Sequence, residues 1–489
     1  MLRLRCACVL LLSVSLVRAD AKVQSRGESR RGAQLPLTTT SIQARKDFAR
    51  AMQNLEQYRP KETLQYLRAS VQDDPQFAQA LILVAQLSPD PEEQSAARHR
   101  AKQLLPGVSP GERLLIRWIA GAQENDYLPA IAAMNDLLSQ YPQDPRIAFL
   151  AGRWLIEQQR YEQAVTILEH AVALTPDYPA ALNDLAYAYA YSGDFEKAFA
   201  AMEDYIALAP DQPNPHDSYG ELLRMDGKFE AALEQYRLSI RIDPNFGSEL
   251  GVADTYALMG REEEAREEYD RAIVFAASES DRIQYELQSA VTWIREGSPK
   301  QAEKALTEVA KHARAAGLAR LEAEADRVLA MSEADAKPAL KHLQAAQKVL
   351  QQSRDLSQSD RNEEVARILR VKAWRLAEEG QMDSAHEAVQ QLGAMADGKS
   401  RIVMLCYQGA AGAVLATEGK SAEAIPYLEE DSTDPVSMRL LWKAYSATGA
   451  AQQARLLALR LSALNVPTVE QALVVPQFRA SLVSQAGQP

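Results

Sequence analysis

Residues 179–210 read PAALNDLAYAYAYSGDFEKAFAAMEDYIALAP and contain the pattern that decides the fold. In the first half, apolar residues recur at the spacing of one helix face: Leu182, Leu185, Ala186 and Tyr189. The second half has its own apolar face, formed by Phe195, Ala198, Met202 and Tyr205. Between the halves, Gly193 permits the left-handed turn that ends a helix, and Asp194 is placed to cap the next one. The stretch therefore predicts two helices joined by a tight turn.

This hairpin recurs with a period of 34 residues over four successive units. Three sets of positions share the period: Pro142, Pro176, Pro210 and Pro244; Tyr127, Tyr161, Phe195 and Phe229; and Ala130, Ala164, Ala198 and Ala232. The small alanine lets the two helices of a unit approach closely, and the proline ends the second helix. One such pair cannot bury its own apolar face, so the pattern predicts a stack of neighbouring pairs.

These positions resemble the tetratricopeptide repeat family, in its bacterial, exported form. The matching residues are Gly152, Tyr161, Ala164, Ala171 and Pro176 in one unit; Ala186, Tyr189, Phe195, Ala198 and Pro210 in the next; Gly220, Phe229, Ala232 and Pro244 in the third; and Ala253, Tyr256, Gly260, Ala265, Tyr269 and Ala272 in the fourth. The resemblance covers residues 110–277. It implies an all-α fold, a right-handed superhelical solenoid of antiparallel helix pairs.

Outside this core the spacing loosens, but the alternation of helical stretches and turns continues, giving about twelve helix pairs in all. We expect divergent repeats over 41–109, well-matched repeats over 110–278, divergent repeats again over 279–465, and a capping helix with a tail over 466–489. The cap is expected because the open end of a solenoid needs a cover. The alternative for this last segment is an exposed apolar docking peptide.

The first nineteen residues have the composition of a secretory signal peptide. Arg3 and Arg5 precede an uncharged apolar stretch of twelve residues that ends at Val17. A membrane-spanning helix needs about 20 apolar residues, so this stretch is too short for a permanent anchor. We expect cleavage near Ala19, a flexible leader over 20–40, and a periplasmic or secreted mature chain without an integral membrane span. An uncleaved, membrane-tethered start is the alternative.

The charge balance argues against nucleic acid as a partner. The chain has 54 Lys+Arg and 66 Asp+Glu, a net charge of −12, whereas nucleic-acid binding needs a basic surface. Cleavage would remove Arg3, Arg5 and Arg18 and no acid, giving −12 − 3 = −15. It would also leave Cys406 as the only cysteine, so the mature chain could form no internal disulfide.

One stretch, residues 393–400 (GAMADGKS), matches the phosphate-loop pattern letter for letter. That site needs a buried strand before the loop, whereas the preceding residues have helical spacing. The six histidines show no metal-binding spacing, and each is expected on a solvated helix face. Cys406 lies in an apolar run and is expected to be a packed thiol. We therefore expect no enzymatic activity, cofactor or metal site, and keep a nucleotide-binding enzyme built around Lys399 as a remote alternative.

What remains is the surface, and the family resemblance implies that the inner groove is lined by the first helix of each unit. The groove positions are Arg146, Phe149, Arg153, Asn183, Tyr187, Tyr191, Asp217, Glu221, Arg224 and Asp254. Aromatic and arginine side chains are common at binding hot spots. The sequence thus predicts an exported interaction scaffold that binds a peptide or protein on its concave face. The main alternative is a sensor or regulatory module that acts in trans on an envelope enzyme, kinase or transporter.

Overall fold

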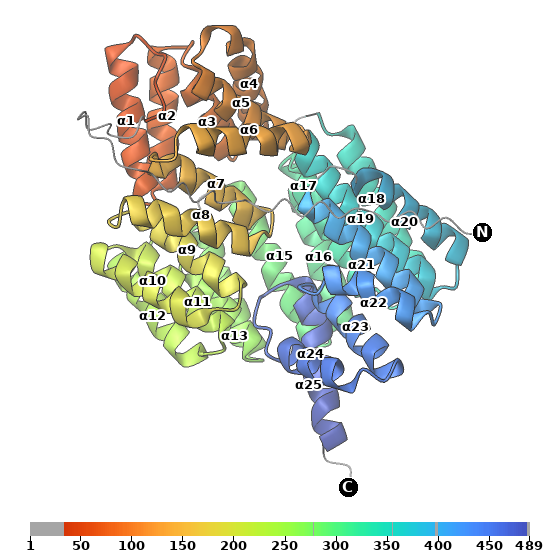
Figure 1. Cartoon of the computed structure of the whole chain (residues 1–489). Helices are drawn as coiled ribbons and strands as arrows, with labels where there is room; N and C mark the ends of the chain where they lie inside the picture. Colours follow the sequence, from red (N-terminus) through yellow and green to blue (C-terminus); the bar gives the residue numbers. More distant parts are fainter. Residues whose placement is uncertain (1–33, 277, 355, 397–399, 487–489) are drawn as a thin grey trace, which may run out of the picture.

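The computed structural model describes residues 34–276, 278–354, 356–396 and 400–486 (Figure 1). Within these residues the chain forms 25 α-helices, one short 3-10 helix at Leu105–Gly107, and no strand. Helices α1 to α24 form twelve consecutive pairs, each packed against the next, and α25 follows them. The expected helical-repeat solenoid is therefore confirmed.

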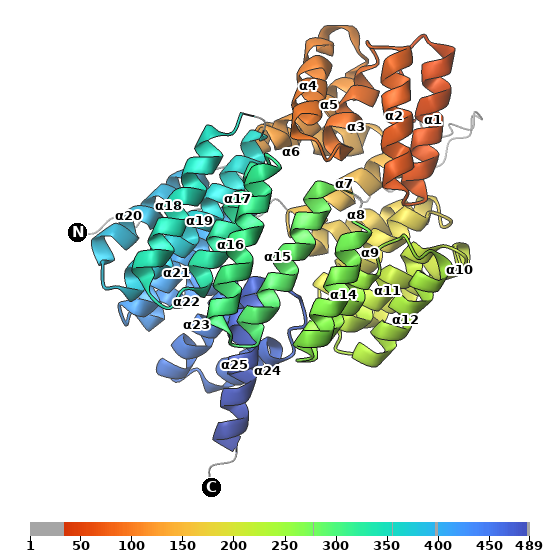
Figure 2. The ribbon, with the colours of Figure 1, turned by 180° about the vertical axis from the view of Figure 1, so that it is seen from behind.

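The solenoid has two arms that lie side by side, as the front and back views show (Figures 1 and 2). The N-terminal arm consists of α1 Ile42–Glu56, α2 Pro60–Asp73, α3 Ala78–Leu87, α4 Pro91–Gln103, α5 Pro110–Gln123, α6 Tyr127–Gln140, α7 Pro145–Glu157, α8 Tyr161–Leu174, α9 Pro179–Tyr191, α10 Phe195–Leu208, α11 Pro213–Met225, α12 Phe229–Ile242, α13 Glu249–Leu258 and α14 Glu262–Val274. The C-terminal arm consists of α15 Glu279–Arg295, α16 Pro299–Ala315, α17 Ala319–Ser332, α18 Ala336–Gln352, α19 Gln358–Glu378, α20 Met382–Ala396, α21 Arg401–Thr417, α22 Ser421–Glu430, α23 Pro435–Ala447, α24 Ala451–Ser462 and α25 Val469–Ala486.

The pair α9–α10 shows how the repeat pattern specifies the local structure. Gly193 has a φ of +87°, the left-handed conformation expected for the turn, and the Asp194 side chain accepts a hydrogen bond from the backbone of Lys197. The small residue in the middle of the first helix is required by close packing. In the preceding pair, a Cβ on Gly152 would lie 2.4 Å from Cγ of Leu168 on α8.

Helix α25 packs against the last helix pair and also against α15, which lies in the middle of the chain. It packs on α23, α24 and α15, with Val474 and Val475 buried. Arg295 on α15 donates a hydrogen bond to Gln471. Helix α25 thus packs against both the last helix pair and the first helix of the C-terminal arm.

The segment before α1 is held against the N-terminal arm from residue 35 onward. The Leu35 amide donates to Asp144, Thr38 donates to Glu112, and the Thr39 hydroxyl donates to Asp74. The end of the segment expected to be a flexible leader is therefore bound to the repeats. The rest of the leader and the expected signal peptide lie outside the described residues. Among the described helices, none is long and apolar enough to cross a membrane.

Candidate functional site

The ten predicted groove residues lie on the first helices of four successive pairs, α7, α9, α11 and α13. Several of them bind one another from one repeat to the next. The Tyr187 hydroxyl donates to Glu221 at 2.6 Å, and Arg224 donates to Glu221 at 2.9 Å and to Asp254 at 2.6 Å. These contacts form a continuous polar ladder along the inner face of the N-terminal arm.

Four of these ten residues are buried and are not exposed to a partner: Phe149, Asn183, Arg224 and Asp254. The prediction of direct partner contact is corrected for them, because the neighbouring repeats cover these positions. Phe149 packs against the Tyr178 ring, with centroids 5.3 Å apart. Asp254 accepts hydrogen bonds from both Tyr269 and Arg224, so its role is to join three helices.

The other six are at least partly accessible: Arg146, Arg153, Tyr187, Tyr191, Asp217 and Glu221. Tyr191 is the most open of the tyrosines here, with 39% of its surface exposed. Its ring stacks on Tyr187 and on Tyr161, with centroid distances of 6.1 and 4.9 Å. Burial raises the pKa of Asp217 to about 7, opposed by a hydrogen bond with Ser248.

A cavity of about 1030 Å³ lies between the two arms and continues this inner face. The N-terminal arm contributes an aromatic and methionine wall that includes Tyr161, Tyr191, Phe195 and Met225. The wall opposite carries cations that are all arginine: Arg327, Arg367, Arg370, Arg401 and Arg460. Of the predicted groove residues, Tyr191 is the one that lines this cavity.

Carboxylates hold most of these arginines in place. Arg370 donates to Asp431 at 2.7 Å and lies 2.8 Å from Asp434, while Arg327 donates to the buried Glu364 at 2.7 Å. Burial raises the pKa of Asp431, although the Arg370 guanidinium beside it opposes this shift. The wall therefore offers both guanidinium and carboxyl groups to a ligand.

Cys406 is a buried free thiol in this wall, as expected, and burial raises its pKa to about 11. At neutral pH it is thus a protonated thiol and a poor nucleophile.

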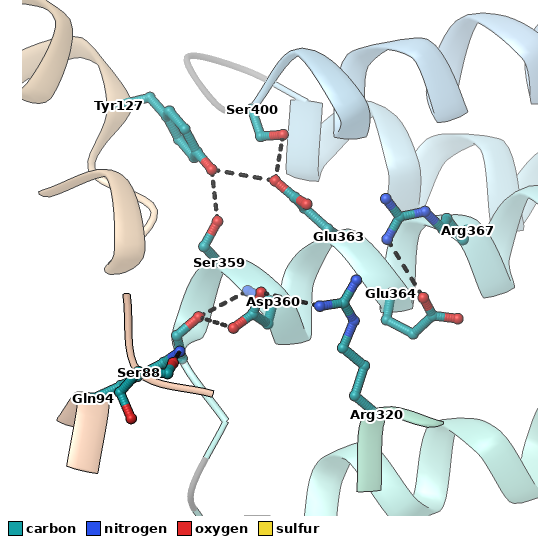
Figure 3. A network of polar contacts seen from close by, with 11 residues as sticks. Ser88, Gln94, Tyr127, Arg320, Ser359, Asp360, Glu363, Glu364, Arg367 and Ser400 are labelled. Atoms are coloured by element: carbon teal, nitrogen blue, oxygen red, sulfur yellow. Dashed lines mark hydrogen bonds and ion pairs between the residues drawn. The ribbon is translucent and has the colours of Figure 1, made fainter. Parts of the chain in front are cut away.

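A polar contact joins α6 of the N-terminal arm to α19 of the C-terminal arm (Figure 3). The Tyr127 hydroxyl points from the N-terminal arm toward Ser359, 2.6 Å away, and donates to Glu363 at 3.3 Å. Ser400 donates to the same carboxylate at 2.8 Å. We call Tyr127, Ser359, Glu363 and Ser400 the latch. The loop between α24 and α25 also reaches the other arm, where a Cβ on Gly227 would lie 3.1 Å from Nδ2 of Asn465.

Two family models, both described as tetratricopeptide repeat, match the N-terminal arm, one over residues 120–179 and one over 151–217. Residues 120–217 are tetratricopeptide repeats. The predicted groove helices α7 and α9 lie within these repeats, whereas α11 lies within them only over its first residues, up to residue 217, and α13 lies beyond them. No curated protein matches the chain.

Several solved structures resemble the tetratricopeptide repeats and the wider solenoid. The Cut9–Hcn1 assembly of the APC/C is 15% identical, with 82% of this chain and 76% of that chain covered and a TM-score of 0.41. A tetratricopeptide repeat protein from Parabacteroides merdae is 11% identical, with coverages of 55% and 92% and a TM-score of 0.35. YrrB, described as having an unusual peptide-binding site, is 13% identical, with coverages of 37% and 92% and a TM-score of 0.26.

The chemistry considered for other parts of the chain does not assemble into a site. The first residues of the 393–400 stretch continue helix α20, and Ser400 caps α21, while residues 397–399, including Lys399, lie outside the described residues. Within the described part of the chain, no cluster of His, Cys, Asp and Glu could hold a metal ion. One histidine prediction was wrong: His216 is buried and hydrogen-bonds to Gln235, because it faces the second helix of its pair.

Sequence reasoning missed the arginine wall because it lies beyond the tetratricopeptide repeats, in helices whose spacing is irregular. Arg367 and Arg370 are three residues apart on α19, which places them on one helix face and is the available local signal. Nothing in the sequence indicates that this helix face lies opposite the N-terminal arm.

Proposed function

We propose that this protein is an interaction scaffold that binds a peptide or protein partner on the concave face of the solenoid, in the cavity between its arms. The observation that carries the proposal is the cavity itself, where tyrosines of one arm face arginines of the other. Solenoids bind partners along their concave surfaces, and tyrosine and arginine are enriched where binding energy concentrates. Tetratricopeptide repeats generally mediate protein–protein contacts. No catalytic role is assigned to any residue.

Site-specific photo-crosslinking tests this proposal. Benzoylphenylalanine in place of Tyr191 would place the reactive group in the cavity. The same group in place of Ile42, which is 75% exposed on α1 and does not line the cavity, provides the control. We expect a polypeptide adduct from position 191 that is absent from position 42. Adducts at 42 alone, or at neither position in the native cell, would contradict the cavity as the binding site.

A second variant distinguishes a partner that binds in the cavity from a protein that is crosslinked there by chance. Arg401 lines the cavity and is held by one 3.6 Å ion pair with Glu430, so its loss leaves the fold largely intact. We expect Arg401→Ala to reduce the yield of the adduct at position 191. The identity of the adduct then distinguishes a scaffold from a regulatory module, because the latter would be joined to an envelope enzyme, kinase or transporter.

We also propose that the chain is exported and cleaved near Ala19. The supporting features are the basic start and the twelve-residue apolar stretch. Sequencing the N-terminus of protein purified from its native host should give Asp20 as the first residue. Detection of the uncleaved chain in the cytoplasm would contradict this proposal.

A further inference from the structure

The turn between α1 and α2 lies against the inner face of the tetratricopeptide repeats. It contacts residues there that are about 90 positions away in the sequence. Glu56 forms an ion pair with Arg146, and the Tyr58 ring lies 5.5 Å from the guanidinium carbon of Arg153. Helix α1 also contacts α9. Arg146 and Arg153, two of the three arginines that the sequence predicted as partner contacts, are thus occupied by another segment of the same chain.

The backbone of this turn is held in an unfavourable conformation. Tyr58 has a φ of 57°, and the corresponding turn position of later pairs is often glycine, as at Gly193, Gly227 and Gly260. A non-glycine residue in this region costs about 1–2 kcal/mol. Such strain persists where surrounding contacts determine the conformation. Backbone hydrogen bonds from the Tyr58 amide to Leu55 and from the Arg59 amide to Asn54 hold the turn, and the contacts of Glu56 and Tyr58 with the inner face add to them.

The surface that receives the turn has a definite chemistry. Arg146 supplies a cation for a carboxylate, and Arg153 supplies a guanidinium over which an aromatic ring can lie. Asp184 lies 3.8 Å from Arg153 and holds it toward the ring. The surface therefore fits a segment with an acidic residue two positions before an aromatic residue.

We propose that this inner-face surface is a docking site for a partner segment with that acidic-x-aromatic pattern, and that the α1–α2 turn occupies the site until the partner displaces it. The site lies outside the cavity, since Arg146, Arg153 and Asp184 do not line it. The inference therefore goes beyond the proposed function. Because the turn belongs to the same chain as the site, it would suppress weak competitors and admit those that match its chemistry.

A peptide taken from the turn itself provides a defined probe. A cyclic octapeptide with the sequence of residues 54–61 (NLEQYRPK), carrying a fluorescent label, is titrated with the full chain and followed by anisotropy. In the Tyr58→Gly variant the ring is removed and the left-handed backbone is relieved. We expect this variant to bind the peptide about tenfold more tightly than the wild-type chain, because the internal competitor is weakened.

Three controls make the result specific. Asn125→Gly relieves the same left-handed turn position in another pair and should leave peptide binding at the wild-type level. The peptide with alanine in place of its tyrosine should not bind. Adding Arg153→Ala to the Tyr58→Gly variant should abolish binding. Glu56→Gln, which keeps the ring and backbone, should give a smaller increase of about threefold and serves if the glycine variant unfolds.

Equal peptide binding by wild-type and both turn variants would overturn the proposal, as would binding that survives Arg153→Ala. Either result would assign the turn a purely structural role. Photo-crosslinking at position 191 tests partner binding in the cavity, whereas the peptide titration tests the inner-face docking site. Failure of one proposal can therefore be distinguished from failure of the other.

Discussion

Gly152 shows how a single residue determines the spacing of a helix pair. A Cβ at this position would meet the fully buried Leu168 at 2.4 Å, so α7 and α8 can approach only because glycine is present. Alanine favours a helix by about 1 kcal/mol over glycine. The clash outweighs this gain, because Leu168 is surrounded and has no free space to enter.

We therefore expect Gly152→Ala to lower the free energy of unfolding by about 1–3 kcal/mol. Urea denaturation followed by circular dichroism measures the change. Gly107→Ala is the matched control, since a Cβ there has no atom within 4 Å. Equal stability of both variants would show that the pair tolerates a wider spacing.

Asp217 links stability to pH. Burial raises its pKa to about 7 in the folded chain, well above that of an exposed aspartate. Between about pH 4 and 7 the folded chain therefore holds a proton that the unfolded chain has released, so the free energy of unfolding falls as pH rises. Asp217→Asn should reduce this fall between pH 5 and 8 in thermal denaturation. Asp211→Asn, on the exposed α10–α11 loop, should leave the pH dependence unchanged.

At the scale of elements, the sequence predicted the N-terminal arm better than the C-terminal arm. Helices α7 to α12 have 13 or 14 residues each, which preserves the 34-residue period. In the C-terminal arm α15 and α16 have 17 residues and α19 has 21, so corresponding positions no longer recur at one interval. The groove helices were predictable for the same reason, whereas burial of Phe149 and Asn183 depends on contacts between repeats.

Helix α25 depends on a few apolar contacts. Phe478 is 4% exposed and meets the Trp442 ring edge-on at 5.1 Å. Replacing a buried phenylalanine by alanine costs about 3–5 kcal/mol. We expect Phe478→Ala to release α25, so that limited proteolysis removes the C-terminal segment before the repeats are cut. Leu456→Ala, on the exposed face of α24, should keep wild-type protection; similar cleavage of both variants would argue against this anchoring role.

At the scale of the whole molecule, the latch holds the two arms together. Tyr127→Phe keeps the ring beside Trp154, 6.4 Å away, and removes the hydroxyl that reaches Ser359 and Glu363. A hydrogen bond of this kind contributes about 1 kcal/mol. We expect amide exchange in the first turns of α19 to become several-fold faster. Tyr445→Phe, which loses a contact with Glu429 in the adjacent repeat, should leave α19 unchanged.

The latch also bears on how the chain folds. Repeat arrays usually fold by propagation between neighbours, because each unit contacts only the next. Tyr127 and Glu363 are 236 residues apart, so their contact closes a very long loop whose entropy cost must be met after both arms exist. Contacts of such high sequence separation slow the final step of folding. The chain should therefore pass through a species in which each arm is formed and the two have not yet met.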